Sequence, residues 1–558
     1  MLPVGAALNL LLLGSAFASG GMAKAVAGAE EPPPSASLAP ETARAAMLGA
    51  AGLLLALWWL LGHRTLQQRL PPGPKAWPLV GNFAFALLPK RLQAFPPRKK
   101  EGKDGERAAE EGGPAPMHVL LTELAKMYGT IFRMNLGSRL VIVLSDFEAV
   151  RDALVTQAEV FSDRPSVPIV AIVTEKKGVV FAPYNPVWKK QRKFSHSTLR
   201  HFGLGKHSLE PKIIEEFKYV KDEILKHGEE QFNPFPIIGN AVSNVICSMA
   251  FGRRFDYDDA EFKKMLNLMS RAMEFSVNSR LLLVNICPWL YYLPFRPFRE
   301  FRQIVLDITA FLKNIIRQHK GSLDVQCPRD FIDMYLLHSD EEKKINGESS
   351  FNEDYLFFII GDLFIAGTDT TSNTLLWSLL YMSLHPQEQR KVQEEIELVI
   401  GCNRPPTLAD KVNMPFTEAT IMEVQRMTVV VPLSIPRMAS ESTELQGYLI
   451  PKGSVIIPNL WSVHRDPNKW ENPNDFCPAR FLNENGQLLK KEAFIPFGIG
   501  KRVCMGEQLA KMELFLMFVS LLQNFTFIYP EDLKKPPMEG RFGLTLAPFP
   551  FKLIALKR

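Results

Sequence analysis

The sequence predicts a mainly α-helical fold with small β-sheets. Helical patterns dominate the 558 residues, and β-rich runs are short, at residues 129–144, 446–450 and 454–457. Hydrophobic residues make up 46% and charged residues 22% of the chain, and these globular values exclude disorder for its bulk. No repeat with a period of about 20–50 residues is present, which argues against a solenoid or a propeller.

Charge and cysteine usage narrow the class further. Lysine and arginine number 65 against 59 acidic residues, a net charge of +6 without a basic tract. This argues against nucleic acid as a partner and fits an anionic membrane surface or an acidic protein better. The six cysteines are scattered without a Cys-x-x-Cys pair, so neither structural zinc nor a thioredoxin-like redox pair is expected. We expect reduced cysteines facing the cytosol.

The first element that the sequence predicts is a membrane-targeting segment. Residues 45–62 are uncharged and mostly apolar, and as a helix they reach about 27 Å, enough for a thin bilayer. Trp58 and Trp59 lie near one end, where amphipathic rings favour the membrane interface. Basic residues follow the stretch and acidic residues precede it, so the positive-inside rule keeps the downstream chain in the cytoplasm. We predict a transmembrane anchor, with an interfacial helix or a buried core helix as alternatives.

The segments around the anchor differ in character. Residues 1–44 form an apolar and flexible extension, in which Met1–Ser19 is either a second membrane contact or poorly ordered, and a signal peptide is poorly supported. Residues 63–82 are basic and proline-rich, and the prolines fix an extended hinge that cannot continue a helix. Residues 83–558 then form the globular domain, in which the charged segment 98–111 is expected to be a solvated loop.

The longest expected helix covers residues 350–384. Ser350 and Glu353 form a capping box at its start, and about 50 Å of helix should cross the core. The sequence Ala-Gly-Thr-Asp-Thr-Thr lies in its middle at 366–371, where glycine costs helix propensity and Thr370 can bond back to the preceding turn. The segment is either a kinked core helix or leaves room for a cofactor or ligand, with proton-handling groups at the opening.

A glycine-rich loop precedes the last long helix. Residues 497–506 read Phe-Gly-Ile-Gly-Lys-Arg-Val-Cys-Met-Gly and lead straight into the helical stretch 506–525. The glycines allow a tight loop, and the helix N-terminus favours a thiolate at Cys504. A thiolate two residues after Arg502 suits an iron axial ligand beside a haem propionate. A lone cysteine is more often a buried core residue, but this loop favours the ligand.

Two further residue pairs each lie on one helix face. Glu423 and Arg426, together with Arg480, can form a carboxylate shared by two arginines, which we interpret as a structural lock on the loop that leads to the cysteine. Trp188 and Arg192 lie four residues apart, and we interpret them as donors to propionate oxygens. The alternative for this second pair is a basic amphipathic surface helix.

Together these motifs resemble the membrane-bound (microsomal) cytochrome P-450 monooxygenases over roughly residues 70–558. The Phe-x-x-Gly-x-Arg-x-Cys-x-Gly loop, the Glu-x-x-Arg pair, the Ala-Gly-x-Asp-Thr-Thr helix and the Trp-x-x-x-Arg pair occur in the family's order and spacing. PPGPKAWPLVGN, FSDRPSVP and WSVHRDP are similar to vertebrate family 2. RKFSHSTLRHFGLGK and the stretch around the cysteine resemble its subfamily U, whose members hydroxylate long-chain fatty acids at or next to the terminal carbon.

The resemblance implies the cytochrome P-450 fold, a helical haem domain with small β-sheets behind an N-terminal membrane anchor, and haem b (iron protoporphyrin IX) as cofactor. It implies Cys504 as the thiolate ligand of the haem iron, and Asp369 and Thr370 as the acid–alcohol pair that delivers protons. The partners it implies for the haem propionates are Trp188, Arg192, Arg502 and Arg437, the last standing where many relatives have histidine. Ala479 departs from the family's acid, which we expect to be harmless because Arg480 is retained.

Partners and location also follow from the resemblance. Electrons would come from an NADPH–haemoprotein reductase, with cytochrome b5 as a second candidate donor, because the chain has no nicotinamide or flavin fingerprint. The basic residues that could dock an acidic reductase are Lys189, Lys190, Lys193 and Lys501. The expected location is the endoplasmic reticulum membrane with the catalytic domain facing the cytosol, and a mitochondrial membrane pool is the alternative. No nucleic acid partner is expected.

The substrate class rests on the resemblance alone. The family's pocket-lining segments are apolar here, which fits a lipophilic small molecule but does not separate a fatty acid from a steroid or a drug. Their apolar residues include Val167, Ile169, Val170, Phe364, Val431, Leu433 and Leu544. Arachidonate-like fatty acids, hydroxylated at the omega or omega-1 carbon, are the expected substrates. The alternatives are a haem-thiolate isomerase or synthase without a reductase and a non-catalytic haem sensor or membrane adaptor, and the Asp369–Thr370 pair argues against both.

Overall fold

The computed structural model describes residues 69–75, 81–82, 116–136, 139–203, 209–276, 283–285 and 287–558. Within them, the chain from Arg69 onward forms one compact unit. The expected extension, anchor and most of the hinge lie outside the described residues, as does the charged loop 98–111. In the part of the chain that is described, no helix is both long and apolar enough to span a bilayer.

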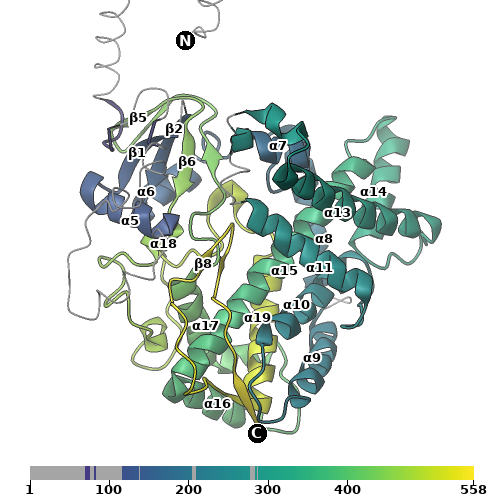
Figure 1. The fold of residues 1–558 in the computed structure, drawn as a ribbon, viewed down its shortest axis with the longest axis vertical. Helices are drawn as coiled ribbons and strands as arrows, with labels where there is room; N and C mark the ends of the chain where they lie inside the picture. The colour runs from purple at the N-terminus through teal and green to yellow at the C-terminus, as the bar shows by residue number, and fades with distance from the viewer. Residues whose placement is uncertain are drawn as a thin grey trace, which may run out of the picture. The chain divides into compact units, whose positions relative to one another are not determined.

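Helices make up most of the unit (Figure 1). The first are α5 (Met117–Tyr128), α6 (Phe147–Arg151), α7 (Pro168–Thr174), α8 (Pro186–Gly203), α9 (Glu210–Leu225), α10 (Pro234–Ala250), α11 (Ala260–Ser276) and α13 (Arg296–Gly321). They are followed by α14 (Phe331–Asn346), α15 (Glu353–Leu384), α16 (Pro386–Val399), α17 (Pro415–Thr428), α18 (Leu460–Val463) and α19 (Glu507–Asn524). Helices α7, α9, α10, α13, α16 and α17 carry proline in their first two positions, where a missing N–H costs no hydrogen bond.

The β-structure is small, as expected. One four-stranded sheet has the order β1-β2-β6-β3, made of Ile131–Leu136, Arg139–Leu144, Val455–Pro458 and Arg437–Met438. Strands β2 and β6 are parallel, with Ile142 opposite Ile456, whereas the other pairs are antiparallel. The two-stranded sheets pair β4 (Thr443–Leu445) with β5 (Tyr448–Ile450), β7 (Phe525–Ile528) with β10 (Ile554–Lys557), and β8 (Arg541–Phe542) with β9 (Leu546–Ala547). The predicted β-runs are confirmed, and the strands they missed have two to four residues.

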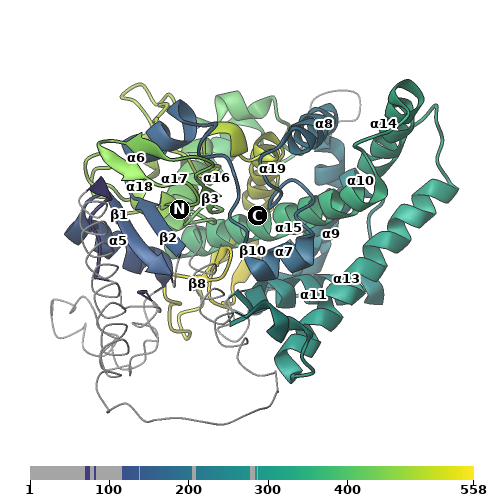
Figure 2. The ribbon, with the colours of Figure 1, turned by 90° about the horizontal axis from the view of Figure 1, so that it is seen from above.

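Helix α15 runs through the core, as predicted from its length. It lies in the middle of the unit in the two perpendicular views (Figure 1 and Figure 2) and packs against α10, α13, α17 and α19. The helix is continuous across residues 366–371. Gly367 leaves room for Ile246 on α10, because a Cβ atom there would lie 2.5 Å from its Cδ1 and the isoleucine side chain would have to shift. The small residue therefore lets two core helices approach closely.

The predicted capping box at the start of α15 is wrong. The cap is Asn352, whose Oδ1 accepts from the backbone N–H of Tyr355 at 3.0 Å. Ser350 instead donates its backbone N–H to Oε2 of Glu342 on α14, at 3.0 Å. Ser350 is therefore bound to the carboxylate of a neighbouring helix, and α15 begins at Glu353, three residues later than expected.

Candidate active site

A cavity of about 270 Å³ lies against α15 and contains most of the predicted site residues. Its wall is formed by parts of α8, α10, α15 and α19, by residues 430–437 and by the loop 496–506. The apolar part of the wall includes Val179, Ile246, Leu363, Val431 and Leu509. Of the seven apolar residues expected at the substrate, Val431 is in this wall, whereas Phe364 is buried and stacks on Phe251 in the core.

Cys504 presents its side chain to this cavity. The residue lies between a 3-10 turn (Gly500–Arg502) and α19, and its backbone N–H donates to the carbonyl of Phe497 at 3.0 Å. Gly500 makes the turn: its φ is +81°, and a Cβ atom would lie 1.9 Å from the carbonyl oxygen of Leu154. The predicted tight loop that presents the cysteine is confirmed.

The protonation of the free thiol differs from the expectation. Burial raises the pKa of Cys504 to about 11, and the opposing effects of the Gly506 N–H and the Arg192 guanidinium are smaller. The N–H of Gly506 at the helix N-terminus therefore favours the thiolate, as predicted, but the desolvation cost of the charge is larger, and the free sulfur is held as the neutral thiol. A bound metal ion is the group that deprotonates such a thiol, since its charge acts directly on the sulfur.

Four guanidinium groups line the same cavity. They belong to Arg164, Arg192, Arg437 and Arg502. Within the described residues no carboxylate forms an ion pair with any of the four. Arg502 donates to the carbonyls of Ser162, Val179 and Ala182, and Arg192 donates to that of Val503.

Arg437 is the least satisfied member of this arginine cluster. Its side chain is buried, and neither Nε nor Nη1 has a hydrogen-bond partner. Burial lowers its pKa to about 9, and the charges of Arg502 and Arg192 add to the effect; burial lowers the pKa of Arg502 to about 9 as well. Buried cations that repel one another require an anion at this place.

Arg164 was not predicted as a site residue. It is buried, donates Nε to the carbonyl of Val180 at 2.8 Å and Nη1 to that of Ile435 at 2.7 Å, and lies in the cavity wall. Its neighbouring sequence, FSDRPSVP, supported the family resemblance, but an arginine in an irregular segment carries no signal of its own. The contact with Ile435 joins segments 271 residues apart in the chain, which a local motif cannot reveal.

Trp188 lies behind the arginine cluster. Its indole Nε1 donates to the carbonyl of Val179 at 2.9 Å, and the guanidinium of Arg502 lies 3.8 Å from the ring centroid. In this structure the ring therefore supports an arginine, and its predicted role as a propionate donor stays a prediction. Asp362, also not predicted, accepts the backbone N–H groups of Val179 and Val180 at 2.7 and 3.0 Å, and burial raises its pKa to about 6.

The two residues of the acid–alcohol pair have different surroundings: Thr370 is in the cavity wall, whereas Asp369 contacts Thr545. Thr370 lines the cavity, and its Oγ1 donates to the carbonyl of Ala366 at 2.7 Å, the predicted bond to the preceding turn. The adjacent Asp369 accepts a hydrogen bond from Oγ1 of Thr545 through its Oδ2. Burial raises the pKa of Asp369, and the side chains of Thr545 and Asn373 and the charge of Arg541 oppose this.

The predicted carboxylate shared by two arginines is confirmed. Glu423 accepts from Nε and Nη2 of Arg426 at 2.7 and 2.8 Å and from Nε of Arg480 at 2.9 Å. It also accepts the backbone N–H of Cys477 at 2.9 Å. Ala479 leaves these contacts in place, as expected, and the buried carboxylate fixes the segment that leads to the cysteine loop.

The predicted basic face on α8 and the cysteine loop is partly neutralised. Lys190 pairs with Glu342 at 3.2 Å, and Lys189 and Lys501 both lie within 4 Å of Glu159, at 3.7 and 3.3 Å. Lys193 is exposed. The side chains of Lys189, Lys190 and Lys501 remain about half exposed, so the charges can be re-paired with a partner.

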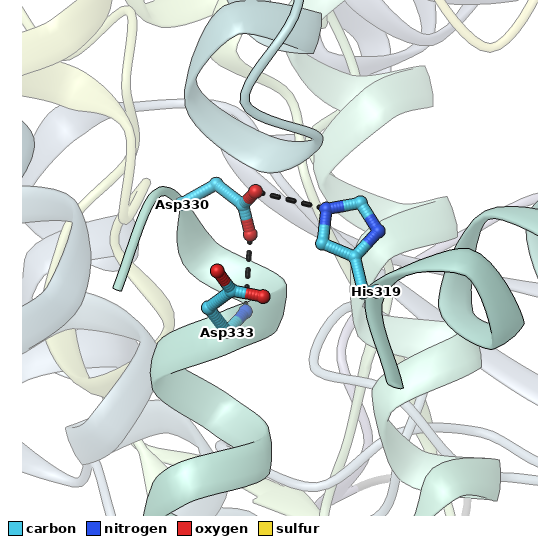
Figure 3. A group of neighbouring side chains, drawn as sticks. All are labelled: His319, Asp330 and Asp333. Atoms are coloured by element: carbon cyan, nitrogen blue, oxygen red, sulfur yellow. Dashed lines mark hydrogen bonds and ion pairs between the residues drawn. The ribbon is translucent and has the colours of Figure 1, made fainter. Parts of the chain in front are cut away.

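A second cluster with metal-ligand side chains lies away from the cavity (Figure 3). His319 on α13 contacts the carbonyl of Ile315 through Nδ1 and Oδ2 of Asp330 through Nε2, both at 2.8 Å. Asp330 caps α14 by accepting the N–H of Asp333, whose carboxylate is held by Arg329. The carbonyl contact makes Nδ1 a donor, and the ion pair makes Nε2 a donor, so the imidazolium has no lone pair for a metal. The cluster is an ion pair that joins α13 to α14.

The main cavity thus combines a cysteine sulfur, an apolar wall and guanidinium groups that need an anion. A group with a metal ion and two carboxylates satisfies all three, so the residues fit haem and define a haem-thiolate protein. The family profile for cytochrome P450 matches residues 110–555. The chain belongs to the cytochrome P450 family, with haem as its cofactor and monooxygenation as its activity.

Curated relatives place the chain more finely. It is 66% identical to human cytochrome P450 2U1 and 64% identical to the bovine protein, in both cases over 91% of this chain and 94% of the relative. It is 40% identical to mouse cytochrome P450 2D10 over 89% of this chain and 94% of that protein. These similarities assign the chain to family 2. They imply association with the endoplasmic reticulum membrane and, as for microsomal members, electron supply by a reductase.

Proposed function

We propose that this monooxygenase hydroxylates long-chain, arachidonate-like fatty acids at the omega or omega-1 carbon. The observation that carries the proposal is the apolar wall of the cavity that Cys504 lines, to which Ile246, Leu363 and Val431 contribute. An apolar wall favours an alkyl chain over a polar substrate at the reacting centre. The choice of fatty acids rests on the resemblance to subfamily U and agrees with the high identity to the 2U1 proteins.

The chain's own residues would hold the cofactor in two ways. Sγ of Cys504 would bind the haem iron, and Arg192, Arg437 and Arg502, with Arg164, would neutralise the propionates. Bound haem supplies oxygen activation and the insertion of one oxygen atom into a C–H bond, and the thiolate pushes electron density toward the iron. The unpartnered Nε and Nη1 of Arg437 support this arrangement, because two buried donors then gain acceptors.

Two residues of α15 would move the protons that the reaction consumes. Thr370 faces the cavity, so its hydroxyl is placed to donate a hydrogen bond there if it leaves the carbonyl of Ala366. Asp369 lies behind it, and burial raises the pKa of its carboxyl, which brings proton uptake and release closer to neutral pH.

Electron supply and location complete the proposal. An NADPH–haemoprotein reductase, with cytochrome b5 as a second candidate donor, would dock on the face that carries Lys189, Lys190, Lys193 and Lys501. The segment 45–62 would be the membrane anchor, 1–44 the extension before it, 63–82 the hinge and 83–558 the haem-thiolate catalytic domain. The catalytic domain would face the cytosol.

The test is a turnover assay with the full-length enzyme in lipid vesicles, together with reductase and NADPH. A panel of fatty acids of increasing chain length is compared with steroids and drug-like amines, and the products are identified by mass spectrometry. We expect omega and omega-1 alcohols from the long chains, formed only with NADPH and reductase. Turnover of steroids or amines alone would contradict the fatty acid assignment and leave the monooxygenase assignment untouched.

A further inference from the structure

The hairpin β8–β9 is attached to two parts of the cavity wall. The backbone N–H of Leu546 donates to the carbonyl of Val430 at 2.8 Å, and Val430 lines the cavity. The carbonyl of Leu546 accepts the indole Nε1 of Trp377, a fully buried residue of α15, at 3.0 Å. Residue 546 is therefore held from both sides, and the position of its neighbour Thr545 is fixed by bonds that do not involve the threonine side chain.

The hydroxyl of Thr545 connects this hairpin to the acid of the proton pair. Its Oγ1 donates to Oδ2 of Asp369 and accepts from Nδ2 of Asn373 at 3.5 Å. Asn373 lies one helical turn after Asp369 on the same face of α15. Because the amide nitrogen can only donate, the hydroxyl proton of Thr545 is left for the carboxylate. The chain of hydrogen bonds thus points from Asn373 through Thr545 to Asp369.

We propose that Thr545 is a positioning residue for the reaction, whose hydroxyl fixes the Asp369 carboxylate in the orientation from which it exchanges protons. The inference rests on the proposed role of Asp369. Thr545 is buried, and the hydrogen bond that it donates to the half-buried carboxylate is partly shielded from solvent. The hairpin is already docked through both backbone groups of Leu546, so docking alone does not account for a hydroxyl at this position.

The groups around Asp369 determine the direction in which its pKa should shift when the Thr545 hydroxyl is removed. Burial raises the pKa of Asp369; the donor Thr545, the amide of Asn373 and the positive charge of Arg541 on β8 oppose the rise. These are the groups that face the carboxylate from α15 and from the hairpin. Removing the Thr545 donor destabilises the ionised form, so the pKa rises and the acid limb of a pH profile moves to higher pH.

The test compares Thr545→Val, which keeps the shape but removes the hydroxyl, with Thr545→Ser, which restores it. Product formed per NADPH consumed is measured across pH with the full-length enzyme, reductase and a fatty acid. For Thr545→Val we expect the acid limb to move up by about one pH unit, since a hydrogen bond to a charged group has roughly that effect. Thr545→Ser should follow the wild type.

Trp377→Phe is the matched control, because it removes the other side-chain bond to the hairpin without touching the carboxylate. It should lower thermal stability and leave the acid limb in place. An infrared readout on the resting enzyme is independent of turnover: the carbonyl band of protonated Asp369, assigned by its loss in Asp369→Asn, should persist to higher pH in Thr545→Val.

The inference is overturned if Thr545→Val matches the wild type in both measurements, or if Trp377→Phe shifts the acid limb equally. A Thr545→Ser variant that behaves like Thr545→Val would also overturn it. If Asp369→Asn keeps full coupling, the proposed role of Asp369 itself fails. If Asp369→Asn uncouples the enzyme while Thr545→Val does not, only the positioning role fails.

Discussion

At the residue scale, several side chains that line the cavity are in energetically unfavourable environments when no ligand is bound. Cys504 is exposed to the cavity, but the surrounding protein raises the pKa of its thiol to about 11, and Arg437 and Arg502 have pKa values lowered to about 9 by burial and mutual repulsion. Each of these costs is removed by a different part of haem: the iron at the sulfur and the propionates at the arginines. The residues therefore contribute more to binding than to the stability of the empty fold.

The first prediction concerns the sulfur. Cys504→Ser should abolish the strongly red-shifted Soret band of the ferrous carbonyl complex, because a thiolate bound to the iron produces that shift. Reduced-minus-oxidised spectra under carbon monoxide check this. The matched controls are serine variants of Cys247, Cys287, Cys327, Cys402 and Cys477, which should keep the band. A Cys504→Ser protein with the full shift would mean that another cysteine is the ligand.

The second prediction concerns the hydroxyl at the cavity. Thr370→Ala keeps the shape of α15 but removes the side-chain donor that faces the cavity, so substrate should still bind and NADPH should still be consumed. Product per NADPH should fall roughly tenfold or more, with hydrogen peroxide released instead, because a positioned proton donor is lost. Thr374→Ala is the control, because Thr374 also bonds back to the helix backbone and lines the cavity. If Thr370→Ala formed as much product per NADPH as the wild type, Thr370 would have a structural role only.

At the scale of elements, local motifs were predicted and long-range contacts were not. The cysteine loop, the Glu423 cluster and α15 follow from spacing and helical periodicity, which are written in contiguous sequence. The start of α15 was missed because Ser350 donates its backbone N–H to Glu342 of another helix and does not cap α15. Arg164 and Asp362 were missed because their partners lie in distant segments, and Phe364 was misplaced because an apolar helix residue serves a core or a cavity equally well.

The third prediction concerns the ion pair between α13 and α14. Burial opposes the charge on His319, but the hydrogen bond and charge of Asp330 outweigh it, so its pKa is raised. A raised folded-state pKa gives stability that is present below the ordinary histidine pKa of about 6.5 and lost as the pH rises through the folded value. His319→Gln should therefore destabilise the protein more at pH about 6 than at pH about 8, measured by thermal unfolding.

A surface histidine supplies the control for this measurement. His196→Gln on α8 removes an exposed imidazole and should shift the unfolding temperature little at either pH. If the loss in His319→Gln were independent of pH, the histidine would contribute as a neutral hydrogen-bond donor and not as a cation. A loss that grew toward high pH would contradict the sign worked out above.

At the scale of the whole molecule, the apolar surface of the described unit matters for location. Trp289, Tyr292 and Phe295, between α11 and α13, have 61%, 68% and 58% of their surface exposed. Aromatic side chains of this size are stable at a membrane–water interface, where the ring contacts lipid and polar atoms stay hydrated. We therefore expect the catalytic unit to make an apolar membrane contact of its own in addition to the predicted anchor.

The fourth prediction follows from these two contacts. Deleting residues 1–69 removes the uncharged stretch 45–62, so the fraction of enzyme that sediments with vesicles should fall while haem binding is retained. The truncated protein should not become fully soluble, because the aromatic residues between α11 and α13 remain. Replacing Trp289 and Phe295 by serine in the truncated chain should release a further fraction, whereas the same change in the full chain should release little. A truncated protein as firmly bound as the full chain would show that the anchor assignment is wrong, since the predicted span would then contribute nothing to membrane binding.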